Sequence, residues 1–149
     1  MIAVDTNVLV YAHRTDSPSH GPAARSLVQL VERGAPWAIA WPCVHEFLAV
    51  VTNHRIFPVP SPSPRALDQV VAWRDAGAHF LAEGAGHFSR LAGLVTAAGI
   101  SGPKIHDARI AALCLDQGID ELWSVDRDFS RFPGLRVRNP LVPGRRRGS

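Results

Sequence analysis

The chain has 149 residues, of which 46% are hydrophobic and 19% are charged, and its formal net charge is +3. This length and composition suit one globular domain with its own core, and they exclude a disordered or low-complexity protein. Charges and prolines interrupt every apolar run, so we expect no membrane-spanning helix, no signal peptide and a cytoplasmic location. The weak positive charge by itself does not identify a partner.

We expect residues 1–142 to form the folded domain. Residues 143–149 are expected to form a basic, disordered tail that carries Arg145, Arg146 and Arg147. The two cysteines, Cys43 and Cys114, lie within apolar helical patterns. This placement favours buried free thiols, and two cysteines are too few for a zinc site of their own.

The first half of the chain predicts strands and helices in alternation. A buried strand is expected at 1–4, a short helix at 7–13, a longer helix from 19 to 34, a strand at 37–41 and a helix at 42–53. The longer helix should bury Ala24, Leu27, Val28 and Val31. Residues 54–63 are rich in proline, which fits neither a helix interior nor a central strand, so they predict a surface loop.

The second half continues the alternation. A helix is expected to start at Ser63-Pro64, followed by a weak strand at 79–82, a helix ended by Gly99, a helix at 107–117 stopped by Gly118, a strand at 122–125 and a further strand at 135–137. The apolar stripes of the first two helices are Leu67, Val70 and Val71, and Leu91, Leu94, Val95 and Ala98. The whole pattern predicts an α/β three-layer sandwich with a mainly parallel central sheet flanked by helices.

Four acidic residues should meet at one edge of this sheet. Asp5 and Asp126 follow predicted strands, and Glu46 and Asp107 lie near the starts of helices that begin at the same edge. Their neighbours are apolar, and isolated carboxylates in such surroundings are costly to bury unless they are paired. No lysine or arginine is placed to neutralise four of them. The pattern therefore predicts a site for Mg²⁺ or Mn²⁺, which prefer carboxylate oxygen ligands.

Each acid also has a simpler interpretation. Asp5 and Asp107 could cap helices, and Asp126 could be a turn residue, whereas Glu46 interrupts an apolar helix and is harder to explain in this way. Asp128 competes with Asp126 for the place of the fourth acid.

Two histidines, His45 and His106, stand next to predicted site acids. Adjacent positions on a helix point in different directions, so we do not expect either histidine to bind the metal.

Four segments in the right order resemble the PIN-domain ribonucleases and, within them, the VapC-type toxins of bacterial toxin–antitoxin pairs. They are residues 2–12 (IAVDTNVLVYA), 46–53 (EFLAVVTN) with 55–57 (RIF), 106–112 (HDARIAA), and 124–129 (SVDRDF) with 132–135 (FPGL). The second segment is similar to that of a subgroup common in mycobacteria. The resemblance covers the chain up to Pro140.

The resemblance implies a metal-dependent endoribonuclease that inhibits translation or growth. Its metal-binding and catalytic acids would be Asp5, Glu46, Asp107 and Asp126, supported by the auxiliary residues Thr6, Asn7, Ser124 and Asp128. Either one or two ions would act. The family further implies a homodimer, a cognate antitoxin protein that blocks the site, and a structured RNA substrate such as tRNA or ribosomal RNA.

Four arginines are candidates for gripping RNA phosphates, and each is also a candidate for a surface salt bridge: Arg14, Arg55, Arg109 and Arg127.

Two other functions compete with the ribonuclease. A phosphatase with Asp5 as nucleophile would want a second aspartate two residues on, where Asn7 stands. A PIN-like module that binds RNA or protein without catalysis is the main alternative, although a binder gains nothing from a complete set of buried, unpaired carboxylates.

Overall fold

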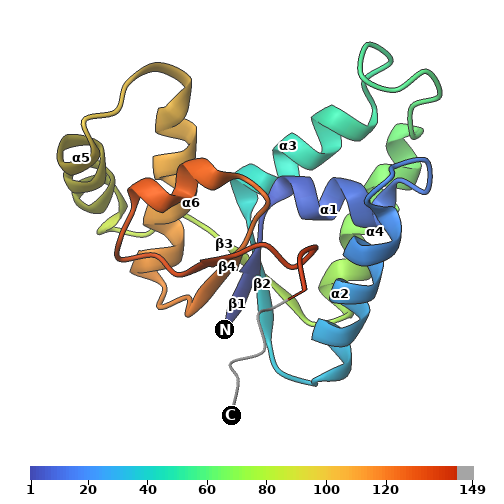
Figure 1. Ribbon diagram of the computed structural model, residues 1–149, viewed down its shortest axis with the longest axis horizontal. Helices are drawn as coiled ribbons and strands as arrows, with labels where there is room; N and C mark the ends of the chain where they lie inside the picture. Colours follow the sequence, from blue (N-terminus) through green and yellow to red (C-terminus); the bar gives the residue numbers. More distant parts are fainter. Residues whose placement is uncertain (144–149) are drawn as a thin grey trace.

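The computed structural model describes residues 1–143, which form one five-stranded sheet with helices on both sides (Figure 1). All neighbouring strands are parallel, and their order across the sheet is β3-β2-β1-β4-β5. The strands are β1 (Ile2–Val4), β2 (Trp37–Ala40), β3 (Ala78–Leu81), β4 (Glu121–Trp123) and β5 (Val137–Arg138). The predicted three-layer α/β fold with a parallel sheet is confirmed. Most of the predicted tail lies outside the described residues, so the domain boundary stays a prediction.

Six helices connect and cover these strands. They are α1 (Thr6–His13), α2 (His20–Glu32), α3 (Trp41–Val51), α4 (Ser63–Asp75), α5 (His87–Ala98) and α6 (Ile105–Asp116), with short 3₁₀ helices η1 (Gly102–Lys104) and η2 (Arg127–Arg131). Helices α1, α2 and α4 lie on one side of the sheet, and α5 and α6 lie on the other (Figure 1). Helix α3 packs against α1 and α4. No helix within residues 1–143 is long and apolar enough to cross a membrane.

The central strands are buried on both faces. All four residues of β2 are buried, and Trp37 is fully inaccessible. A strand covered by helices on both sides needs apolar residues at successive positions, which is why these strands read as continuous apolar runs. Both cysteines are buried and free, as predicted.

The buried faces of two helices differ from the prediction. Helix α2 buries Ala23, Leu27 and Leu30, while the predicted core residue Val28 is 54% exposed and Val31 is also exposed. Each set has helical spacing, so the sequence allows two inward faces and packing against α1 selects one of them.

Helix α4 shows the same difference. It begins at Ser63 itself, with Pro62 at the N-cap position, and it buries Ala66 and Trp73. The predicted core residue Leu67 is 53% exposed, and Val71 is also exposed. The stripe predicted for α5, by contrast, packs against the core as expected.

Candidate metal centre

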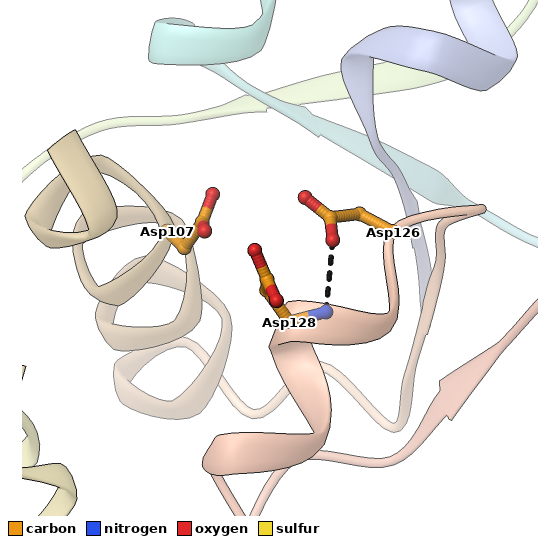
Figure 2. Close-up of side chains that lie close together, drawn as sticks. All are labelled: Asp107, Asp126 and Asp128. Carbon is orange, nitrogen blue, oxygen red and sulfur yellow. Dashed lines mark hydrogen bonds between the residues drawn. The ribbon is translucent and has the colours of Figure 1, made fainter.

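Three aspartates converge at the carboxyl edge of the sheet. Asp107 lies in the first turn of α6, Asp126 precedes η2 shortly after β4, and Asp128 lies within η2. One carboxylate oxygen from each lies within 4.8 Å of the others, and Figure 2 shows the three carboxylates facing a common space. The backbone N–H of Asp128 donates to Asp126 Oδ1 at 2.8 Å, and this turn brings Asp128 beside Asp126. Both alternatives for the fourth acid therefore stand at the site.

Asp5 lies deeper at the same edge, directly after β1. Its side chain belongs to a residue that is only 5% exposed. Ser124 Oγ donates to Asp5 Oδ2 at 2.7 Å, and the thiol of Cys43 donates to Oδ1 at 3.5 Å. Ser124 Oγ also accepts from the backbone N–H of Asp126 at 3.0 Å. This one hydroxyl therefore links Asp5 to the group of three aspartates.

Glu46 approaches from α3 and differs from the prediction in its burial. Helix α3 buries Cys43, Val44, Phe47 and Val51, which leaves Glu46 exposed. The prediction that Glu46 is buried among apolar residues is therefore wrong, because α3 turns this side chain toward solvent. Thr6 Oγ1 donates to Glu46 Oε2 at 3.1 Å, and this bond holds the carboxylate at the site edge.

The acids act on one another electrostatically. Partial burial, and after it the negative charges of Asp126, Asp5, Asp128 and Glu46, together raise the pKa of Asp107 to about 6. Burial also raises the pKa of Asp5, and the hydrogen bond from Ser124 opposes that rise. Within residues 1–143, no lysine or arginine forms an ion pair with any of these five acids. The site thus concentrates negative charge that the protein itself does not neutralise.

This arrangement fits a hard divalent cation. Mg²⁺ binds carboxylate oxygens and water and is usually held by few carboxylates, so the three close aspartates supply suitable ligands and Asp5 and Glu46 supply further acids nearby.

Two hollows flank the acids. The first, of about 630 Å³, lies beside β4, η2 and β5, and its wall includes Ser124, Asp126, Arg127, Ser130, Arg138 and Asn139. The second, of about 410 Å³, lies between α3 and α6, and its wall includes His45, Glu46, Pro103, His106, Asp107 and Arg109. Each of these two walls includes at least one acid of the candidate metal centre, Asp126 in the first and Glu46 and Asp107 in the second.

The four candidate arginines fall into different settings. Arg14 is buried; its guanidinium donates to the Asp16 carboxylate and to the Val59 carbonyl, and it stacks over Phe57 at 4.2 Å. These contacts match the salt-bridge alternative. Arg109 donates to Glu83 at 2.9 Å while it lines the second hollow.

Arg127 and Arg55 are exposed and have no ion pair within residues 1–143; Arg127 lines the first hollow. The auxiliary candidate Asn7 is exposed on α1.

Sequence reasoning missed two residues near the site. Cys43 donates to Asp5, and it precedes Glu46 by three positions on α3, a spacing that places neighbours on a helix close together. Arg138 lines the first hollow, and only the pairing of β5 with β4 brings it there.

Comparisons with known proteins match the chain over most of its length. The PIN domain family model matches residues 2–135. Ribonuclease VapC43 of Mycobacterium tuberculosis is 37% identical over 142 residues, which are 95% of this chain and 96% of the relative. Ribonuclease VapC37 of the same species is 33% identical over 141 residues, which are 94% of this chain and 97% of the relative.

Solved structures share the fold at low identity. The crystal structure of Mycobacterium tuberculosis VapC20, described as a sarcin-ricin loop cleaving toxin, has a TM-score of 0.63 at 16% identity and covers 87% of this chain and 93% of its own. VapBC2 from Rickettsia felis, bound to a DNA fragment from its promoter, has a TM-score of 0.68 at 18% identity and covers 93% of this chain and 98% of its own. The chain belongs to the PIN-domain family and, within it, to the VapC ribonucleases.

Proposed function

We propose that this protein is a metal-dependent endoribonuclease and the toxin of a toxin–antitoxin pair. The observation that carries the proposal is the group of three close aspartates joined through Ser124 to the buried Asp5, with no compensating cation among residues 1–143. The ribonuclease names of its relatives support RNA as the substrate. We propose a structured RNA, either tRNA or ribosomal RNA; the description of VapC20 as a sarcin-ricin loop cleaving toxin supports a looped RNA substrate.

The ligand set we propose for Mg²⁺ or Mn²⁺ is Asp5, Glu46, Asp107 and Asp126, with Asp128 as an auxiliary or alternative acid. A bound ion would supply an activated water for attack on a phosphodiester and would stabilise the charge that develops on the phosphate and the leaving group.

The protein side chains have distinct parts in this arrangement. Asp5 is held in one orientation by Ser124 and Cys43, so it needs no rearrangement to serve as a ligand. The pKa of Asp107 is raised to about 6, and a bound cation would lower it again because the cation favours the ionised carboxylate. Thr6 keeps Glu46 at the edge of the site and limits its motion. These supporting bonds orient the ligands before the substrate arrives.

Three further expectations belong to the same proposal. We propose a cognate antitoxin as partner, because the VapC-type toxins that this chain resembles are paired with antitoxins and the solved VapBC2 of Rickettsia felis shares its fold. We also propose a homodimer and a cytoplasmic location, where RNA is available. Light scattering that shows a monomer at micromolar concentration, without antitoxin, would contradict the homodimer.

The decisive experiment pairs metal binding with cleavage. Mn²⁺ and Mg²⁺ are titrated calorimetrically into metal-free parent and into Asp107→Asn, and both proteins are incubated with tRNA and ribosomal RNA. We expect the variant to bind metal much more weakly and to leave RNA intact. Asp75→Asn, at an exposed aspartate on α4 that pairs with Arg74, is the matched control and should behave as the parent.

Two outcomes would overturn the proposal. If Asp107→Asn cleaves as fast as the parent, the site is wrong. If the parent binds RNA tightly but cleaves none across Mg²⁺ and Mn²⁺ titrations, the non-catalytic RNA-binding module becomes the better interpretation.

A further inference from the structure

The hollow between α3 and α6 has a wall of two chemical kinds. One part consists of the apolar side chains of Pro42, Pro103 and Ile110 and the flat imidazole rings of His45 and His106. The acids Glu46 and Asp107, both from the candidate metal centre, form another part of the same wall. Whatever fills this hollow therefore lies against two acids of the candidate metal centre.

Aromatic support makes His45 a firm part of that wall. Trp41 lies one turn before His45 on α3, with ring centroids 6.0 Å apart and an angle of 31° between the planes. Trp41 in turn packs against Phe80 of β3 at 4.7 Å. The exposed imidazole of His45 is thus backed by a ring that is anchored on the sheet, which is the kind of rigid surface on which bases stack.

The charges in the wall of this hollow indicate which part of a nucleotide can bind there. A divalent cation would at most offset the negative charges of Glu46, Asp107 and the acids beside them, and Arg109 is already paired with Glu83 at 2.9 Å, so this hollow has no spare positive charge for a further phosphate. The hollow beside η2 has the opposite balance, since Arg127 and Arg138 accompany the single acid Asp126. A neutral, flat base therefore suits the α3–α6 hollow, and a phosphate suits the hollow beside η2.

We propose that the α3–α6 hollow binds an unstacked nucleobase of the RNA, the one next to the bond that is cut, through stacking on His45. This inference rests on the proposed ribonuclease function and adds a substrate subsite to it. The hollow's volume of about 410 Å³ lies within the ~300–1,000 Å³ of ordinary ligand sites. Single-stranded loops are the RNA elements that present such bases.

The first test measures binding without cleavage. Each of the four ribonucleoside 5′-monophosphates is titrated at constant saturating Mg²⁺, and the imidazole proton resonances of the histidines are followed by NMR. We expect at least one nucleotide to shift the resonances of His45 and His106 while that of His54, on the exposed loop after α3, stays in place.

Variants then separate stacking from other contacts. His45→Ala should weaken binding of that nucleotide by about 5- to 100-fold, His45→Phe should restore most of it because the ring is kept, and His54→Ala should match the parent. The subsite is overturned if no nucleotide at millimolar concentration shifts His45 and His106, or if His45→Ala binds as tightly as the parent. If His45→Phe fails to restore binding, stacking is not the interaction and the assignment of a base falls with it.

A cleavage assay distinguishes failure of the base subsite from failure of the ribonuclease activity. An RNA that the parent cuts is remade with an abasic nucleotide on each side of the cut in turn. We expect one of the two abasic RNAs to raise KM for the parent, and to have no further effect on His45→Ala. If the parent cuts RNA and His45→Ala has the same KM and the same response to both abasic RNAs, the ribonuclease stands and the subsite falls. If the parent cuts no RNA, the proposed function fails and the NMR titration still decides the hollow.

Discussion

Asp5 and Asp107 carry the same side chain at the same edge of the sheet, but they differ in burial and in the groups that surround them. Asp5 is only 5% exposed, and each of its carboxylate oxygens accepts a hydrogen bond, one from Ser124 and one from Cys43. Asp107 is half-buried, and its nearest charged partners are other acids. Donors offset part of the cost of burying Asp5, whereas no ion pair within residues 1–143 offsets the repulsion at Asp107.

This difference identifies Asp5 as the carboxylate whose orientation the fold itself fixes. The position of Asp5 is set by the fold whether or not a cation is bound, because its donors belong to the sheet and to α3. The carboxylates of Asp107, Asp126 and Asp128 lie close enough to repel one another, and a bound cation would offset that repulsion. Removing either carboxylate should therefore give similar losses of activity but different changes in stability.

The largest effect is expected from replacing either acid. Asp5→Asn and Asp107→Asn should each reduce RNA cleavage on the order of a thousandfold or more, because each removes a proposed metal ligand. Cleavage of a fixed RNA at saturating Mg²⁺, with circular dichroism to verify folding, measures this. Asp75→Asn again serves as the control, and near-parental cleavage by either site variant would contradict the assignment.

The two variants should differ in metal-free stability. Asp107→Asn should be more stable than the parent by about 1 kcal/mol, a value reduced for solvent screening of a half-exposed carboxyl. Asp5→Asn should be less stable than the parent, because the NH₂ group of the new amide would face Ser124 or Cys43. Both of these groups donate to the carboxylate of Asp5, and one of the two hydrogen bonds would be lost. Urea unfolding at neutral pH with a chelator measures the free energy of unfolding of both variants. If both variants are more stable than the parent, or both are less stable, the proposed difference between the surroundings of Asp5 and Asp107 is wrong.

The next largest effect concerns the hydroxyl that joins the two settings. Ser124→Ala removes the donor to Asp5 and the acceptor for the Asp126 N–H, so Mn²⁺ affinity and cleavage should each fall about 10- to 100-fold. Calorimetry and initial rates measure the two losses. Ser89→Ala, on the exposed surface of α5, is a matched serine control. Unchanged Mn²⁺ affinity in Ser124→Ala would mean that Asp5 needs no support.

The pH dependence should follow the raised pKa of Asp107, which moves from 3.8 to about 6 on folding. Between these values the folded state holds more protons than the unfolded state, so the stability of the metal-free protein should fall as pH rises from about 4 to about 6. Mg²⁺ affinity should rise over the same window, since the cation displaces the proton. Thermal unfolding with and without Mg²⁺ checks both trends, and Asp107→Asn should flatten them.

The smallest effect is expected at the exposed acid. Thr6→Val removes the only side-chain hydrogen bond to the Glu46 carboxylate within residues 1–143. The Glu46 side chain is exposed, so packing does not fix its orientation. We expect a loss in cleavage of less than about tenfold, below the range typical of supporting residues around a metal. A loss as large as that of Ser124→Ala would show that Glu46 must be oriented as strictly as Asp5.

The sequence by itself determined the parallel α/β fold and the edge at which the acids meet. Strand and helix patterns are local, and the rule that parallel strands end at one edge is general, so Asp5, Asp107 and Asp126 could be placed without coordinates.

Only the tertiary structure decided the details that distinguish these residues. The inward face of α2 and α4, the exposure of Glu46 and the bond between Ser124 and Asp5, 119 positions apart, all depend on how distant segments pack. Helical periodicity allows more than one inward face, and a side-chain hydrogen bond between remote residues leaves no local signal. Packing therefore made Asp5 a fixed carboxylate and left Asp107 among its repelling neighbours.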